Sequence, residues 1–589
     1  MKPRLRFFLG LLAGCLLLAL LFLSLTSTSR FIRFCDRFFQ EAMERNALTL
    51  HYTVSDPEKY DIQCENISLE MDSPDIFFEK LILKTIARGQ LSADLQKTYD
   101  LLNYTFTTET MLQKYPLMEE PLTPSIGVQS QLPILLAEYA FEEEADVVNY
   151  LTLLTCIPQY FDSILEFETE KSDAGLFMDA ETARELIRYC EQFLKDTKTH
   201  FLKETFEERI LALHLDSSKN TSYIEENARL LETSLFPSYE KLRQFLKEHE
   251  NDGINADGLY YFPQGTDYYA LLIRSEIGCD KTFEEIETLL ETALKKDARI
   301  LTSLTAKNPK LLESRNNISL DTSNPAGLAA YLSKRASHDF PDIPEVTVKI
   351  SPVPASMEPH LSPAFYLVPT IDNWTENVVY LNNSSLQKDL SLFTTLAHES
   401  YPGHLYQTVY ENHTHPHPIH RLLYFGGYTE GWGTYAEQMS YHYAPVSESL
   451  AVYLSTARTL TLNLYAHLDL YVHAYGWTEN DCKDYLKKFG ITNSGSVHQM
   501  YLLVKQQPAN YLKYYLGYLE ICNLKETAIG CLGSDFNLKE FHKFLLDYGP
   551  APFELLEQYL ETWLMEKSQT VRGDSLAVSR RKEYFIYSF

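Results

Sequence analysis

Hydrophobic residues recur at helical spacing along most of the chain. From residue 31 to about residue 235 the apolar positions repeat every three or four residues, as in 180–202, and few segments alternate as strands do. Residues 377–381 are the main exception, because Asn377-Val378-Val379-Tyr380-Leu381 is a short β-branched and aromatic run that predicts a strand. The pattern therefore predicts a mainly α fold with a small β element, which we expect to be antiparallel.

A helix is predicted directly after this strand. Ser384 and Gln387 have capping-box spacing, and an apolar stripe follows at intervals of four, three and four residues, formed by Leu386, Leu390, Phe393 and Ala397. The strand would lie beside this helix. A strand in that place could bind an extended peptide by backbone pairing.

The predicted helix runs into the segment His398-Glu399-Ser400-Tyr401-Pro402-Gly403-His404. Two histidines flank a carboxylate, which is typical of zinc sites in which the carboxylate acts as a base. A six-residue step turns a regular helix by roughly 600°, so His404 would point about 120° away from His398. Pro402 lacks an N–H and Gly403 tolerates unusual backbone angles. We therefore expect the helix to kink or end at this pair and His404 to turn back toward the same ion.

A catalytic zinc site needs a third protein ligand and one open position. Glu430 is the predicted third ligand, at the start of a probable helix that begins Glu430-Gly431-Trp432-Gly433. Glu437 lies two turns later on the same face, and we predict that it holds a ligand histidine through its other ring nitrogen. Glu399 is the predicted general base, and the predicted reaction is hydrolysis of a peptide bond or a related amide.

The runs 398–407 and 430–437 resemble the paired signatures of the family called domain of unknown function 885, a set of predicted zinc peptidases with an H-E-x-x-P-G-H motif followed by E-G-W. The resemblance extends over roughly residues 235 to 565. It implies a fold similar to the mostly helical gluzincin peptidases, with two helical lobes flanking a channel and the metal on the channel floor. Such a channel favours short peptides as substrates.

The chain departs from the family pattern near Pro508. Ala509 and Asn510 follow it where the family usually has Gly-Gln, and Leu503-Val504 replaces an expected Arg-Tyr pair. Tyr514 keeps its place, and its phenol could donate a hydrogen bond to the oxyanion of a tetrahedral intermediate. Because Tyr511, Tyr515 and Tyr518 accompany it at helical spacing, packing is the competing interpretation of the same residue.

Four further histidines lie between the two motifs, at positions 413, 415, 417 and 420. Pro416 and Pro418 make this segment a predicted surface connector, with a role in substrate or accessory metal binding as the alternative. A Pro-rich passage from 339 to 363 predicts a boundary between a helical part, 31–345, and a metal-bearing part, 346–567. Residues 568–589 form a predicted C-terminal tail.

The N-terminal segment, residues 1–30, carries Lys2, Arg4 and Arg6 before an uncharged apolar run from 7 to 25. Nineteen residues make a helix of roughly 28 Å, enough to span a bilayer core. We predict an uncleaved signal anchor with the bulk of the chain extracytoplasmic. A cleaved signal peptide, which would make the protein secreted, and lipid attachment at Cys15 in the lipobox-like Leu12-Ala13-Gly14-Cys15 are the alternatives.

Charge narrows the expected partners. The chain has 52 Lys plus Arg and 80 Asp plus Glu, which gives a formal charge of −28. This charge disfavours nucleic acid as a partner. The nine cysteines include no C-x-x-C pair, so no cysteine-based zinc motif is present in the sequence. The expected partners are a Zn²⁺ cofactor, a short peptide substrate and a membrane. The alternatives are a metal-free peptide-binding protein, a zinc amidase for a non-peptide amide, and a structural zinc site with four protein ligands.

Overall fold

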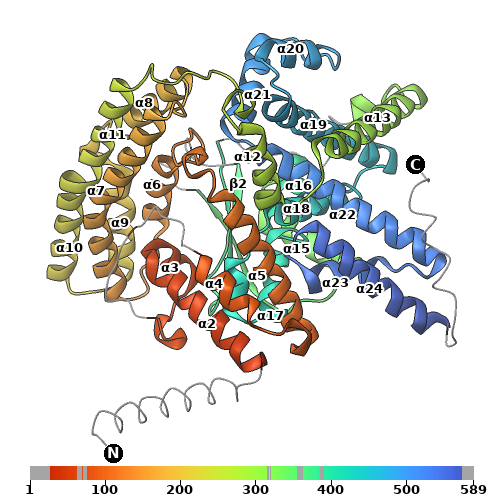
Figure 1. Ribbon diagram of the computed structural model, residues 1–589, viewed down its shortest axis with the longest axis horizontal. Coiled ribbons are helices and arrows are strands. Elements are labelled where there is room, and N and C mark those ends of the chain that lie inside the picture. Colours follow the sequence, from red (N-terminus) through yellow and green to blue (C-terminus); the bar gives the residue numbers. More distant parts are fainter. Residues whose placement is uncertain are drawn as a thin grey trace, which may run out of the picture.

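A computed structural model shows the fold of the chain (Figure 1). It describes residues 27–572 except 63–68, 70–75, 315–317, 319, 354–357, 359–362 and 385–389. The N-terminal half is formed by helices α2 Ser27–Arg45, α3 Ala47–Thr53, α4 Phe77–Lys84, α5 Ala93–Leu112, α6 Val128–Glu138, α7 Glu144–Asp173, α8 Ala180–Phe193, α9 Phe201–Ala212, α10 Ser217–Leu230, α11 Phe236–Glu248, α12 Gly265–Leu272, α13 Phe283–Lys307, α14 Leu311–Ser314 and α15 Pro325–Ala336.

The C-terminal half contains the sheet and the remaining long helices. Its strands are β1 Thr347–Pro352, β2 Ala364–Leu367 and β3 Glu376–Leu381; its helices are α16 Leu390–Glu399, α17 His404–Thr414, α18 Gly426–Tyr441, α19 Glu448–Ala474, α20 Glu479–Lys487, α21 Ser494–Gln506, α22 Asn510–Leu532, α23 Leu538–Tyr548 and α24 Phe553–Arg572. Short helical turns join several of these, among them η2 Arg88–Gln90, η7 Ile273–Ile277 and η10 Pro418–Leu422. The chain is mainly helical, as predicted.

The three strands form one sheet in the order β1-β3-β2. The strand predicted at 377–381 is confirmed as β3, and its side chains alternate between buried and more exposed positions. The expectation of an antiparallel element is only partly right. β2 pairs antiparallel with β3, but β1 pairs parallel with it, in register from Thr347 opposite Glu376. The connection between β1 and β3 makes a parallel partner possible, because it is long enough to bring the chain back to the same end of the sheet.

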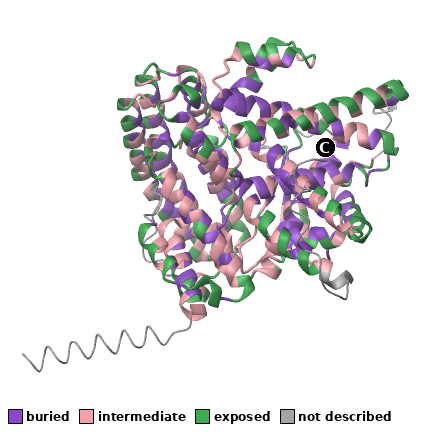
Figure 2. Cartoon of the chain, turned by 45° about the vertical axis from the view of Figure 1, so that its right-hand side comes forward, coloured by how far each residue is buried: buried purple, intermediate pink, exposed green. Residues whose placement is uncertain are grey.

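Helices α6 to α11 pack on one another and form the bundle at the left of Figure 1. Their hydrophobic core is separate from the main one and includes the fully buried side chains of Tyr150, Phe161 and Tyr239. Figure 2 shows the buried positions gathered along the inner faces of the helices and the exposed positions along their outer faces. This distribution is the one that the helical periodicity of the sequence requires.

The main hydrophobic core joins residues from both sides of the predicted boundary at 345. It includes Phe31 and Tyr269 from the N-terminal half and Trp432 and Phe541 from the C-terminal half. Phe340 lies in the Pro-rich passage itself, and its ring stacks on that of His542 with centroids 4.1 Å apart. The Pro-rich passage therefore interrupts the helices without separating two cores.

Both ends of the chain lie largely outside the described residues. The predicted anchor from 7 to 25 falls there, as does residue 573 onward, whereas α24 continues through the predicted start of the tail at 568. Within the described part of the chain, no helix is both long enough and apolar enough to cross a membrane.

Candidate metal centre

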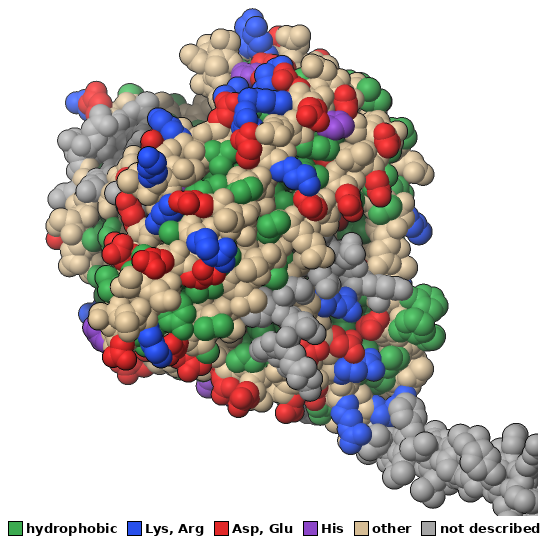
Figure 3. Space-filling model, turned by 90° about the vertical axis from the view of Figure 1, so that its left-hand side faces the viewer, with side chains coloured by type: hydrophobic (Ala, Val, Ile, Leu, Met, Phe, Trp, Pro, Cys, Tyr) green, Lys and Arg blue, Asp and Glu red, His purple; other side chains and the backbone are tan. Residues whose placement is uncertain are grey.

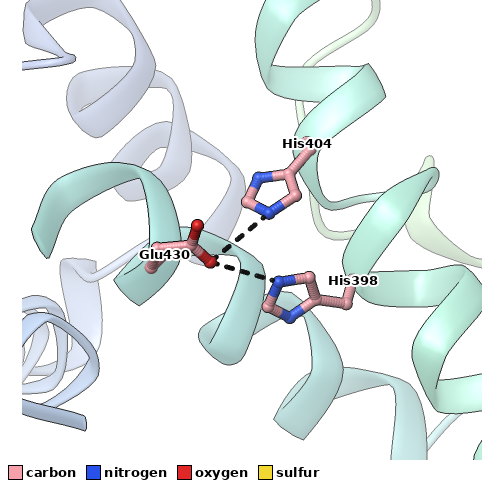
Figure 4. A group of neighbouring side chains, drawn as sticks. All are labelled: His398, His404 and Glu430. Carbon is pink, nitrogen blue, oxygen red and sulfur yellow. Dashed lines mark ion pairs between the residues drawn. The ribbon is translucent and has the colours of Figure 1, made fainter. Parts of the chain in front are cut away.

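Helix α16 ends at Glu399, and a new helix, α17, begins at His404. The expected break between the two histidines is therefore confirmed. A side chain at position 403 would collide with the carbonyl of His398, so only glycine allows the backbone to pass there. The turn returns His404 to the side of His398 (Figure 4).

The ligand atoms of His398, His404 and Glu430 meet at this turn. Glu430 Oε2 lies 3.5 Å from His398 Nε2 and 3.6 Å from His404 Nε2. One possible ligand atom from each of the three residues lies within 4.8 Å of the other two. Among the described residues, no other three His, Cys, Asp or Glu side chains bring ligand atoms this close together. The three side chains are between 13% and 17% exposed, so the group is sheltered but reachable from solvent.

Glycine on α18 makes room for both histidines. Gly433 follows Glu430 by three residues and therefore lies on the same helix face. A Cβ atom at this position would come within 2.8 Å of His398 Nε2 and 2.9 Å of His404 Cε1. The two imidazole rings, nearly perpendicular at 88°, thus pack directly on the backbone of α18.

Three further glycines bring α18 against α22. A Cβ atom at Gly431 would overlap the backbone of Gly517, and one at Gly517 would overlap the backbone of Gly427. The two helices can therefore approach to backbone contact. This approach fixes Glu430 relative to the side chains of α22.

Glu437 lies near the other side of His398. Its Oε2 is 3.9 Å from His398 Nδ1, longer than a hydrogen bond. Its carboxylate instead pairs with Arg458 on α19, whose Nε donates at 2.8 Å and whose Nη2 donates at 3.4 Å. Arg458 therefore holds Glu437 in a position that faces the imidazole.

The carboxylates around His398 favour a positive charge at this place. Burial alone would lower the pKa of His398, but the hydrogen bond to Glu430 and the charges of Glu399, Glu430 and Glu437 outweigh it and raise the pKa to about 9. Burial would raise the pKa of Glu430, yet its two histidine neighbours hold it well below the ordinary range. Without a metal, the carboxylates thus keep positive charge on His398.

Glu399 faces the sheet. Its Oε2 accepts a hydrogen bond of 3.0 Å from the backbone N–H of Tyr366. Tyr366 belongs to β2, and among the described residues β2 has a strand partner on one side only, so its other edge faces the end of α16. The predicted base therefore lies between the histidine pair and an open sheet edge.

Tyr514 also lies beside the histidines. Its ring centroid is 6.4 Å from that of His398, with the planes inclined by 29°. Burial, together with the charges of Glu430 and Glu399, raises the pKa of the phenol well above its ordinary value, so it remains a hydrogen-bond donor. Its neighbours in the tyrosine cluster have packing roles: Tyr511 stacks on Tyr465, and Tyr515 is fully buried.

A buried carboxylate orders the start of α22. Asp469, on α19, accepts hydrogen bonds from the hydroxyl of Tyr269 and from the backbone N–H groups of 509, 511 and 512. These are N–H groups of a first helical turn, which need partners outside the helix. Asp469 thereby fixes the turn that precedes Tyr514.

The roles of several of these residues were not predicted from the sequence. Gly433 had a visible signal, because it follows Glu430 at helical spacing. Arg458 and Asp469 had none, since each lies on a helix distant in sequence from its partner. The N–H of Tyr366 is a backbone group that no residue type reveals.

The histidines between the motifs lie elsewhere. His415, His417 and His420 line a cavity of about 390 Å³ together with side chains of α2 and α5. His417 lies 3.3 Å from Asp36, and the rings of His415 and His420 are 5.1 Å apart. They do not form a group of converging ligand atoms within the described residues.

A family model matches most of the chain. A model of the family described as "Bacterial protein of unknown function (DUF885)" matches residues 79–560. The chain belongs to this family. Both predicted metal-binding motifs fall inside the matched region. No curated protein matches this DUF885 chain.

Two solved structures share the fold of this DUF885 member. One is described as "the putative lipoprotein from Colwellia psychrerythraea", with TM-score 0.78 and 18% identity over 92% of this chain and 100% of that one. The other is "a putative lipoprotein of unknown function from Shewanella oneidensis", with TM-score 0.62 and 14% identity over 91% and 99%. At these identities the likeness establishes the fold alone.

Proposed function

We propose that this DUF885 member is a zinc-dependent peptidase that hydrolyses peptide bonds in short peptides outside the cytoplasm. The observation that carries the proposal is the convergence of His398, His404 and Glu430 beside the carboxylate of Glu399. The other parts of the proposal depend on this group.

The three residues fit zinc. Two ligand atoms that each lie about 2.0–2.1 Å from a tetrahedral zinc ion are separated by about 3.4 Å. The distances from Glu430 Oε2 to the two Nε2 atoms, 3.5 and 3.6 Å, are close to this value. Two imidazoles and one carboxylate form a donor set of catalytic zinc sites, in which the fourth position stays open.

When bound, zinc would polarise a carbonyl group and lower the pKa of a bound water toward about 7. Glu399 would accept the proton of the attacking water and pass it to the leaving amine. The N–H of Tyr366 fixes one of its oxygens, which leaves the other for this transfer. Tyr514 would donate its hydroxyl hydrogen to the developing oxyanion, since its phenol remains protonated beside His398.

The open edge of β2 is the proposed place for the peptide backbone. A substrate that pairs with this edge would lie along α16, next to Glu399. In the two-lobed, gluzincin-like arrangement that we infer, the α6–α11 bundle and the part that carries the metal would form the two walls of a channel. Such a channel admits extended chains and excludes folded proteins.

The proposed location is outside the cytoplasm, with the N-terminal apolar run attaching the chain to the membrane. The apolar run from 7 to 25 supports this. The two structural neighbours are themselves described as putative lipoproteins.

Metal analysis of the full chain tests the proposal. We expect about one zinc per chain, lost in His398→Ala and Glu430→Gln. Glu399→Gln should keep zinc and abolish cleavage in a peptide library. If the unaltered protein holds no zinc after dialysis against zinc, the proposal fails and the alternative of a metal-free peptide-binding protein is favoured. Zinc with unchanged turnover in Glu399→Gln would assign the base to another residue, and turnover of non-peptide amides alone would identify an amidase.

A further inference from the structure

Helix α4 presents hydrophobic side chains to solvent. Phe77 and Phe78 are each 64% exposed and Leu81 is 53% exposed, while Leu83 on the opposite face is buried. Phe77, Leu81 and Lys84 follow one another at helical spacing, so they share one face, and Phe78 adjoins it. Single exposed apolar residues are common, but three on one short helix mark a binding surface.

Cationic residues border these side chains. Lys84 is exposed at the end of α4. Arg30 on α2 donates to Thr85 Oγ1 at 2.8 Å, and Arg33 lies one turn further along the same helix. We call Phe77, Phe78, Leu81, Lys84 and Arg33 the α4 patch. Figure 3 shows hydrophobic, basic and acidic side chains close together at the lower right of the face drawn there.

Two acidic residues of helix α2 pair with side chains outside the α4 patch. Asp36 faces His417 at 3.3 Å, and Glu41 pairs with Arg37 at 3.5 Å. Glu79 Oε2 is buried. The α4 patch itself contains two cationic residues and no acidic residue, on a protein whose formal charge is −28.

The patch lies beside the point where the described chain begins. Ser27 donates to Gln90 Oε1 at 2.6 Å, five residues beyond the Thr85 that Arg30 contacts. The eight residues of α4 span about 12 Å, so Phe77 and Phe78 lie about one helix length from the contact between Arg30 and Thr85. The uncharged apolar run from 7 to 25 ends just before Ser27, and every charged residue before Asp36 is basic.

We propose that the α4 patch docks on the anionic headgroup layer of a lipid bilayer. Phe77, Phe78 and Leu81 enter the boundary between headgroups and acyl chains, while Lys84 and Arg33 contact lipid phosphates. The anionic lipid surface repels the rest of the protein, which is acidic. The α4 patch therefore determines which side of the protein faces the membrane.

The experiment uses the full chain with a tryptophan in the patch, Phe78→Trp, reconstituted in vesicles of brominated phosphatidylcholine and phosphatidylglycerol. Bromine quenches tryptophan inside the bilayer. The matched control is Ile254→Trp, because Ile254 is 80% exposed and lies four residues before Gly258, which packs against Val472 of α19. The signal of the unaltered chain in the same vesicles is subtracted from both.

We expect at least about twofold stronger quenching of the added tryptophan at 78 than at 254, weakened by high salt or by omission of phosphatidylglycerol. Equal quenching at the two positions would overturn the proposal. Quenching that ignores both salt and phosphatidylglycerol would overturn the role given to Lys84 and Arg33. A concentration-dependent emission shift at position 78 without quenching would assign the patch to a second copy of the chain, against the proposal.

Discussion

The indole nitrogen of Trp432 donates a hydrogen bond of 2.8 Å to the carbonyl oxygen of Pro402. Trp432 lies on α18, two residues after Glu430, and Pro402 lies in the turn that precedes His404. One hydrogen bond thus ties the helix that carries Glu430 to the turn that orients His404. Because the indole is fully buried, no water can replace it.

Trp432→Phe keeps most of the buried ring and removes the donor. We expect the free energy of unfolding to fall by about 1–3 kcal/mol, since the Pro402 carbonyl loses its buried partner. Zinc affinity should fall as well, because the turn that places His404 is released. Urea unfolding and competition with a zinc chelator measure the two effects; unchanged zinc affinity would show that the turn holds His404 without Trp432.

Gly433→Ala places a methyl group against both imidazoles. We expect zinc affinity to fall by about 10- to 100-fold, because the rings must move away from Glu430. Gly530→Ala on α22 is the matched control, since nothing lies within 4 Å of the added Cβ. It should stabilise the helix by about 0.5–1 kcal/mol and leave zinc binding unchanged. Equal zinc affinities in the two variants would contradict the packing of the rings on α18.

Arg458→Gln tests the support of Glu437. Loss of a cation beside a buried carboxylate costs about 3–5 kcal/mol, but the Arg458 side chain is 42% exposed, so we expect only about 1–2 kcal/mol. Zinc affinity should fall in Arg458→Gln and in Glu437→Gln to a similar degree, because each disturbs the same pair. A loss in Glu437→Gln alone would mean that Glu437 keeps its position without Arg458.

Asp469 predicts a specific pH dependence of stability. Burial raises its pKa to about 7, against the opposing hydrogen bonds from Tyr269 and the start of α22. The unfolded chain has a pKa of about 3.9 at this residue, so between about pH 4 and pH 7 the folded state holds a proton that the unfolded state lacks. Its contribution to stability therefore falls as pH rises through this window, by at most about 4 kcal/mol.

Asp469→Asn removes this titration. The free energy of unfolding is measured for the variant and for the unaltered protein at pH 5 and at pH 7.5. The other titrating groups contribute equally to both proteins, so their contributions cancel in the difference. We expect the unaltered protein to lose stability relative to Asp469→Asn as pH rises. A gain instead would show that the four hydrogen bonds keep the carboxylate ionised.

Much of the candidate metal site could be predicted from the sequence, because its determinants are local. The order His-Glu-x-x-Pro-Gly-His forces a helix to end between the two histidines, and α16 and α17 meet there as expected. The strand at 377–381 and the helical character of the chain follow from periodicity in the same way. The parallel pairing of β1 did not, since strand direction depends on the path of the connection.

The sequence by itself thus determined which side chains could bind a metal and where the helix had to break, because backbone sterics act over a few residues. Only the tertiary structure decided that Glu430 lies opposite the two histidines, that Arg458 pairs with Glu437, and that Asp469 caps α22. Each of these pairs joins residues 20 or more positions apart. Their contacts arise from helix packing around a common core, which no short window of sequence encodes.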